Sequence, residues 1–121
     1  MFLNDLYTVV ESTASAGSVN TVIAINKSHK IFDGHFPGHP VLPGVCMMQI
    51  VREVLEQSTS LRLNITFGDN VKFLAIIDPE QNSQVTVGIT YTEEENTYKV
   101  NAQLFHGMVT FFKFKGVLER K

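Results

Sequence analysis

The chain has 121 residues, a formal net charge of −2 and 44% hydrophobic residues. This length is enough for one domain with its own core and too short for two, so we expect a single domain over residues 1–121. The weak negative charge gives no reason to expect a nucleic acid or an anionic membrane as a partner. The opening residues lack the pattern of a secretory signal, and no segment has the ~20 apolar residues of a membrane span.

The cysteine content points to a reducing compartment. Cys46 is the one cysteine, so no intramolecular disulfide can form, and we expect a cytoplasmic protein. Cys46 stands among apolar residues of a predicted helix, which favours a buried small side chain. A nucleophile is the alternative, because helix N-termini lower the pKa of a thiol.

The chain opens with two stretches rich in β-branched residues, Leu6 to Thr13 and Val19 to Asn26. The glycine and small residues between them signal a turn, so these stretches predict an antiparallel hairpin. The first stretch could instead begin as a short helix, because its periodicity is too brief to decide.

The next regular element is a helix from Val45 to Gln57, a stretch without glycine or proline. Three prolines and three glycines exclude a helix or a central strand in the segment before it. Its first half is apolar on every face except at Gln49, which predicts a helix buried all round. Such a helix needs other elements to wrap it.

The rest of the chain supplies strands for this wrapping. Strand patterns occur at residues 61–67, 71–77, 84–91, 97–106 and 108–118, and a charged tip at residues 93–96 separates two of them. We predict an α+β fold in which four or five long antiparallel strands curl around one helix. Edge strands and one end of the helix would stay uncovered, so we expect a homodimer, with a higher oligomer or a heterodimer as the alternatives.

Residues 32–45, Phe-Asp-Gly-His-Phe-Pro-Gly-His-Pro-Val-Leu-Pro-Gly-Val, carry a resemblance to a known family. They closely resemble the active-site signature of the hotdog-fold β-hydroxyacyl-acyl carrier protein dehydratases of type II fatty-acid synthesis. Val71-Lys72-Phe73-Leu74 resembles the strand that follows the helix in that family. The resemblance covers about residues 32–79. Asp78-Pro79-Glu80 departs from the family's usual proline-glycine-aspartate, and the N-terminal part lacks the usual opening.

The resemblance implies a hotdog fold, a curved antiparallel sheet around a central helix, used as a dimer with two sites at the interface. It implies loss of water from a (3R)-3-hydroxyacyl thioester to give a trans-2-enoyl thioester. The acyl group would be carried on the phosphopantetheine of an acyl carrier protein or on CoA, with no other cofactor and no metal. The pathway stays open between fatty-acid, polyketide and aryl polyene synthesis.

The resemblance also assigns site residues. His35 matches the catalytic histidine, and an imidazole suits removal of the C2 proton at neutral pH. The N–H of Gly44, at the helix start, matches the donor that stabilises the thioester oxygen, assisted by the helix dipole. Four further residues are expected to line the substrate site: Val45, Phe36, Pro43 and Phe73.

The acid of the family is missing from its usual position. Gln49 stands there, and glutamine can donate hydrogen bonds or hold a water but cannot deliver a proton. Glu53 stands one turn later, where the family typically has glutamine. Residues at i and i+4 share a helix face, ~6 Å apart along the axis, and helical side chains lean toward the N-terminus. Glu53 could therefore act in catalysis through a water, or it could face solvent.

Simpler interpretations stand beside these. His39 is expected to be structural, and His29 and His106 to be surface or strand residues. A metal site at His35 and His39 lacks a third ligand nearby in sequence. Met47 and Met48 are core residues or line an acyl tunnel. Four cations could meet an acidic carrier protein, although a solvated surface is the simpler interpretation: Arg62, Lys72, Lys113 and Lys115.

Three functional hypotheses follow. The first is a 3-hydroxyacyl-thioester dehydratase. The second is a non-catalytic or heterodimer-dependent hotdog protein that binds an acyl carrier, with Gln49 marking a lost acid. The third is a hotdog thioesterase, in which the same helix start would polarise a carbonyl for hydrolysis.

Overall fold

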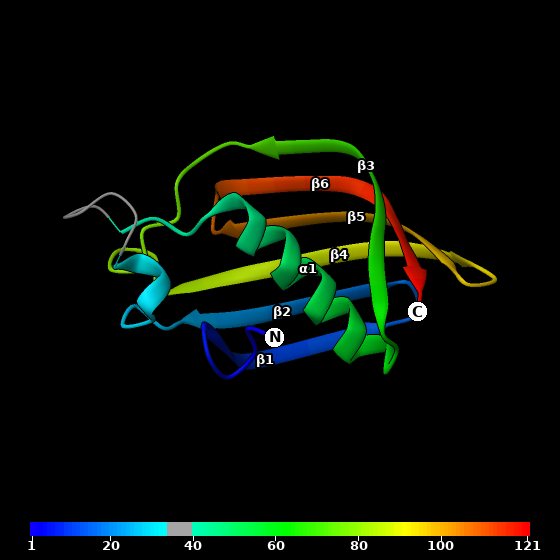
Figure 1. The fold of residues 1–121 in the computed structure, drawn as a ribbon, viewed down its shortest axis with the longest axis horizontal. Helices are drawn as coiled ribbons and strands as arrows, with labels where there is room; N and C mark the ends of the chain where they lie inside the picture. Colours follow the sequence, from blue (N-terminus) through cyan, green and yellow to red (C-terminus); the bar gives the residue numbers. More distant parts are fainter. Residues whose placement is uncertain (34–39) are drawn as a thin grey trace.

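A curved antiparallel sheet wraps around one long helix in the computed structural model, which describes residues 1–33 and 40–121. Within these residues the sheet has six strands in the order β1-β2-β4-β5-β6-β3, and helix α1 lies along its inner face (Figure 1). The elements are β1 Tyr7–Ser15, β2 Ser18–Ile25, η1 Lys30–Phe32, α1 Gly44–Thr59, β3 Leu63–Phe73, β4 Gln84–Glu94, β5 Thr97–His106 and β6 Val109–Arg120. The predicted hotdog fold is confirmed, with six strands where four or five were expected.

The predicted N-terminal hairpin is confirmed as β1 and β2. Its turn contains Gly17 at φ 78°, a left-handed conformation that a residue without a Cβ adopts readily. The strands pair from Tyr7 with Ile25 to Ser15 with Ser18, with one register shift after Val9. The alternative of a short initial helix is wrong for β1 itself, because this stretch pairs as a strand from Tyr7 onward.

The stretch after the helix forms one strand where the sequence predicted two. β3 runs unbroken from Leu63 to Phe73, and its pairing with β6 shifts register twice, between Ile65 and Phe67 and between Gly68 and Asn70. Such bulges add unpaired residues and change which face the side chains point to. The interrupted alternation at residues 68–70 therefore reflects bulges and not a loop.

The core lies between α1 and the inner face of the sheet. Helix residues such as Ile50, Val51 and Leu55 are fully buried, as are Val85 and Val87 of β4. The first turn of α1 departs from the prediction of burial all round, because the side chain of Val45 is 74% exposed. The sheet covers only one side of this turn, so the opposite side is open at the surface.

No helix in residues 1–33 and 40–121 combines the length and apolar character that crossing a bilayer would require.

Candidate active site

The start of helix α1 has two backbone N–H groups without a partner in residues 1–33 and 40–121. Pro43 precedes the helix in an extended conformation, and no side chain caps it. The N–H groups of Cys46 and Met47 bond to the carbonyl of Pro43 at 3.0 and 3.3 Å. Those of Gly44 and Val45 have no hydrogen-bond partner among the described residues. Free N–H groups and the positive end of the helix dipole suit an oxygen that gains negative charge.

An apolar hollow of about 450 Å³ lies in front of this helix start. Pro43 and Gly44 border it from the loop and helix, and Phe73 borders it from the end of β3. The lining residues are Val41, Leu42, Pro43, Gly44, Met47, Phe73, Leu74, Ala75 and Ile76. Such a lining suits a hydrocarbon chain, and Gly44, the first residue of the helix, forms part of one wall.

The ring of Phe73 packs closely against the backbone of Gly44. A Cβ added at Gly44 would overlap the ring of Phe73, so glycine is the residue that allows this close approach. The ring of Phe73 also packs on Phe112, with centroids 5.2 Å apart. The structure thus brings Pro43, Gly44 and Phe73 together, whereas the side chain of Val45 lies at the surface and outside the hollow.

The predicted residues His35, Phe36 and His39 lie outside the described residues, so their roles stay predictions. His29 was expected at the surface or in a strand, but it caps the short helix η1. Its Nδ1 accepts a hydrogen bond from the N–H of Ile31, and its Nε2 lies 3.0 Å from Asp5. No group of three His, Cys, Asp or Glu side chains in the described part of the chain could hold a metal ion.

Glu53 lies at the centre of a buried hydrogen-bond cluster. Its side chain is 0% exposed, so the alternative that Glu53 faces solvent is wrong. Oε1 accepts hydrogen bonds from the N–H groups of Phe2 and Leu3, at 3.1 and 2.9 Å, and from the hydroxyl of Tyr7, at 3.0 Å. Oε2 accepts from the N–H of Phe2 and from Nε2 of Gln49, both at 2.8 Å.

All four groups around Glu53 can donate, so both of its buried oxygens have hydrogen-bond partners. Burial first, and then the charge and hydrogen bond of Glu53, raise the pKa of Tyr7 far above its usual range. The Tyr7 hydroxyl therefore keeps its proton and donates a hydrogen bond to Oε1 of Glu53.

The N-terminal half of this cluster was not predicted from the sequence. Phe2 and Leu3 contribute backbone N–H groups, which leave no signature in residue type. One signal was available for Glu53 itself, because Cys46, Ile50 and Glu53 follow helical spacing and fall on the buried stripe of α1. An acid on such a stripe needs buried donors.

Cys46 lies on the same buried stripe. Its side chain is 2% exposed, and burial raises the pKa of its thiol. Both observations favour the expectation of a small core side chain over that of a nucleophile.

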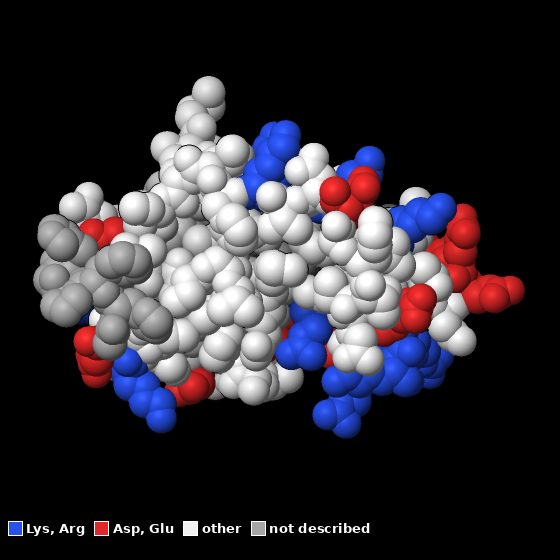
Figure 2. Space-filling view, turned by 45° about the horizontal axis from the view of Figure 1, so that its top comes forward, with Lys and Arg blue, Asp and Glu red and all other residues white. Residues whose placement is uncertain are grey.

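The side of the molecule that contains the helix start is largely uncharged. Figure 2 shows a broad surface without Lys, Arg, Asp or Glu, with charged side chains around its margins. Four large apolar residues at the helix start and after β3 are more than half exposed: Val45 74%, Phe73 57%, Leu74 52% and Ile76 65%. Three of them, Phe73, Leu74 and Ile76, border the same hollow, and exposed apolar residues grouped in this way are typical of an interaction site.

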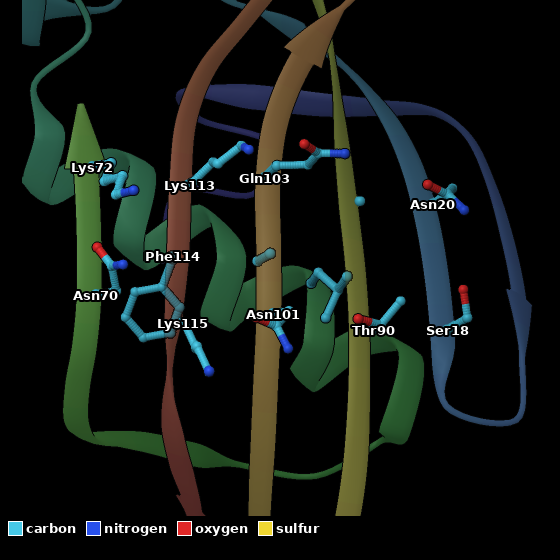
Figure 3. A pocket seen from close by; sticks show the side chains of 13 residues that line it. Ser18, Asn20, Asn70, Lys72, Thr90, Asn101, Gln103, Lys113, Phe114 and Lys115 are labelled. Carbon is cyan, nitrogen blue, oxygen red and sulfur yellow. The ribbon is translucent and has the colours of Figure 1, made fainter. Parts of the chain in front are cut away.

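A second hollow, of about 380 Å³, lies on the sheet face that points away from α1 (Figure 3). Lys72 of β3 and Lys113 and Lys115 of β6 border it, together with amide side chains such as Asn101 and Gln103. Three of the four cations considered for an acidic carrier protein thus gather here, whereas Arg62 borders a different hollow. That these lysines receive a carrier stays a prediction.

Comparison with known proteins gives consistent matches. Residues 11–110 match the family model described as ApeI-like, ApeI dehydratase. A 3-hydroxyacyl-[acyl-carrier-protein] dehydratase FabZ of Ralstonia nicotianae is 30% identical over 106 residues, which are 80% of this chain and 56% of that protein. The FabZ of Caulobacter vibrioides is 26% identical, over 83% of this chain and 59% of that protein. The chain thus spans less than two thirds of the length of these relatives.

A solved structure shares the fold over nearly the whole chain. It is that of the dehydratase heterocomplex ApeI:P from Xenorhabdus doucetiae, and it matches with a TM-score of 0.76 and 19% identity over 94% of this chain and 98% of that chain. An uncharacterized protein from Erwinia carotovora subsp. atroseptica matches with a TM-score of 0.69 and 16% identity, over 96% of each chain.

Proposed function

The chain belongs to the family of ApeI-like dehydratases, and on this premise we propose that it removes water from a 3-hydroxyacyl thioester to give a trans-2-enoyl thioester. The observation that carries this proposal is the start of α1, where Gly44 borders an apolar hollow and the N–H groups of Gly44 and Val45 have no partner among the described residues. The acyl group is proposed to arrive on the phosphopantetheine of an acyl carrier protein or on CoA.

In the proposed reaction the acyl chain occupies the hollow, and the thioester oxygen lies against the start of α1. His35 removes a proton from C2, and the N–H groups stabilise the charge that develops on the oxygen. The C2–H electron pair becomes the C2=C3 double bond as the C3–O bond breaks. The departing hydroxide takes a proton and leaves as water.

The proton for the leaving hydroxyl cannot come from Gln49, because an amide does not ionise in this range. The side chain of Glu53 is 0% exposed and both of its oxygens are engaged by other groups of the chain, so it offers no open face to the substrate hydroxyl. We therefore assign the transfer to His35, whose imidazolium carries the proton taken from C2. Gln49 does not border the hollow of its own chain, so it is assigned to hydrogen bonding with the hydroxyl of a substrate held by the partner subunit of a dimer.

The test uses the hydration of a crotonyl thioester, supplied on CoA and on a carrier protein. His35→Ala is expected to lower kcat at least ~100-fold, the usual scale for loss of a general base. His39→Ala, in the same segment, is the matched control and is expected to retain activity. Turnover that survives His35→Ala would overturn the assignment, and release of free thiol would replace it with thioester hydrolysis.

The exposed apolar surface favours a second candidate, a dehydratase that works only with a partner subunit. Val45, Leu74 and Ile76 are more than half exposed around the helix start, so a second subunit is proposed to cover them. A homodimer is our first expectation. A heterodimer is the alternative, by analogy with the ApeI:P structure, which is described as a heterocomplex. Full activity of the purified chain alone would exclude a required heterodimer.

A further inference from the structure

We propose that the sheet face that points away from α1 is the docking surface for an acidic region of the protein that carries the acyl group. This surface, which we call the lysine face, consists of Lys72 of β3, Lys113 and Lys115 of β6, and the polar side chains around the same hollow. The inference rests on the proposed function for the nature of the partner, and it adds the place where that partner binds.

Strand pairing gathers the three lysines at one side of the sheet. Lys72 lies directly opposite Lys113 in the register of β3 and β6. Lys115 follows Lys113 by two residues in β6, so the two side chains share a face of the sheet. All three residues are exposed, and Figure 3 shows them around one hollow, on two neighbouring strands.

No carboxylate pairs with these lysines in residues 1–33 and 40–121. The residues that border the hollow include no Asp or Glu, and none of the three lysines lies within ion-pair distance of an acid. Asp69, the nearest acid along β3, does not border the hollow. Like charges directly opposite each other destabilise an antiparallel pair, so the contact of Lys72 with Lys113 costs stability that a bound anionic partner would recover.

Uncharged polar side chains continue from the lysines across the sheet. Gln103 of β5 is paired with Lys113, and Asn101 of β5 is paired with Lys115. The other polar residues that border the hollow are Ser18, Asn20, Asn70 and Thr90. Amide and hydroxyl groups can donate hydrogen bonds to carboxylates. An acidic surface would therefore meet three cations on one side of the hollow and uncharged donors along the rest of it.

The lysine face lies next to the proposed substrate site, on the opposite face of β3. Lys72 and Phe73 are consecutive residues, and successive side chains of a strand point to opposite faces of the sheet. Phe73 borders the hollow at the start of α1, whereas Lys72 borders the lysine face. β3 is the last strand on this side of the sheet and ends at Phe73. A carrier docked at Lys72 therefore lies beside the strand end around which its flexible prosthetic group would reach the hollow.

The charge distribution favours a protein over the other anionic partners. Three exposed cations spread over two strands suit an extended acidic surface better than a single phosphate group, which needs donors that converge on it. The chain as a whole has a net charge of −2, so the rest of its surface would repel a long polyanion such as a nucleic acid. Charge complementarity of this kind mainly accelerates the encounter with the partner.

Lys113→Glu tests the docking surface, with crotonyl thioesters supplied on an acyl carrier protein of fatty-acid synthesis, on CoA and on pantetheine, which has no charge. We expect KM for the carrier-borne substrate to rise at least ~10-fold, the lower end of what electrostatic steering contributes to association. KM for the CoA and pantetheine substrates should stay unchanged. Lys99→Glu is the matched control and should leave all three KM values unchanged. It makes the same change in net charge on β5, but Lys99 already lies 4.0 Å from Glu94 and does not border the hollow.

The three substrates separate the possible outcomes. An unchanged KM for the carrier-borne substrate in Lys113→Glu would overturn the proposal. An equal rise in KM for the carrier and CoA substrates would also overturn it, because the lysines would then bind the phosphates of CoA. Loss of fold cannot imitate the expected result, since Lys113→Glu places an acid opposite Lys72 and should keep or raise the Tm.

A binding measurement does not depend on activity. The carrier protein with phosphopantetheine but without an acyl group is titrated into the ¹⁵N-labelled chain, and the backbone signals of Gln103, Lys113 and Lys115 should shift. The affinity should fall with rising salt and at least ~10-fold in Lys113→Glu. Binding at these strands without dehydratase activity would contradict the proposed function and leave the lysine face established. Shifts confined to other strands would overturn the lysine face and leave the proposed function standing.

Discussion

At the scale of single residues, the contact between Gln49 and Glu53 was predictable and its surroundings were not. Spacing of i and i+4 places both side chains on one helix face, and the hydrogen bond at 2.8 Å confirms this. The other donors to Glu53 come from residues 46 to 51 positions away, and two of them are backbone groups. A sequence pattern shows neither a backbone donor nor its distance in space.

The buried Tyr7 gives the stability of the protein a specific alkaline dependence. The pKa of Tyr7 is raised in the folded chain, chiefly by burial, from a value near ~10 in the unfolded chain. Above pH ~10 the unfolded chain loses this proton while the folded chain keeps it, so the free energy of unfolding falls with pH, by up to ~1.4 kcal/mol per unit. Below that pH the contribution is fully present.

Tyr7→Phe is expected to remove this part of the slope. Denaturant unfolding at several pH values between about 9 and 11 would measure it. At neutral pH the variant should be less stable by ~1–2 kcal/mol, because it loses a buried hydrogen bond to a charged group. Parallel pH profiles for the two proteins would contradict the raised pKa of Tyr7.

At the scale of elements, α1 and the end of β3 meet where the ring of Phe73 packs directly against Gly44, which has no Cβ. The helix start and β3 were both predicted, but their approach at Gly44 and Phe73 was not, because it depends on how the bulges of β3 direct its last residues. Bulges depend on tertiary pairing, and in the sequence they only interrupt the alternation.

This match predicts a non-additive pair of substitutions. Gly44→Ala alone combines a gain in helix propensity of ~0.5–1 kcal/mol with overlap against the Phe73 ring. In a Phe73→Ala background the overlap is gone, and Gly44→Ala should be stabilising. We expect a coupling of about 1 kcal/mol in the free energy of unfolding across the four proteins. Additive effects would show that the ring of Phe73 moves aside at no cost.

At the scale of the whole molecule, the sequence was sufficient to predict a sheet wrapped around a helix. The two-residue alternation of the strands and the long apolar stretch of the helix could both be recognised in it. It failed at the first turn of α1, where Val45 is apolar and nevertheless 74% exposed. Apolar character predicts that a residue will be covered, but it does not tell whether the same chain or another one covers it.

The exposed apolar surface therefore predicts how the protein assembles. We expect a dimer in solution that Ile76→Asp dissociates, because a carboxylate would be buried in the interface without a partner. Met108→Asp is the matched control, since Met108 is 100% exposed in the turn between β5 and β6. Light scattering after gel filtration would show half the mass for Ile76→Asp and an unchanged mass for Met108→Asp. If Ile76→Asp remains a dimer, the interface lies elsewhere on the molecule. If the natural chain is a monomer, a different protein must cover this surface, as the heterodimer alternative requires.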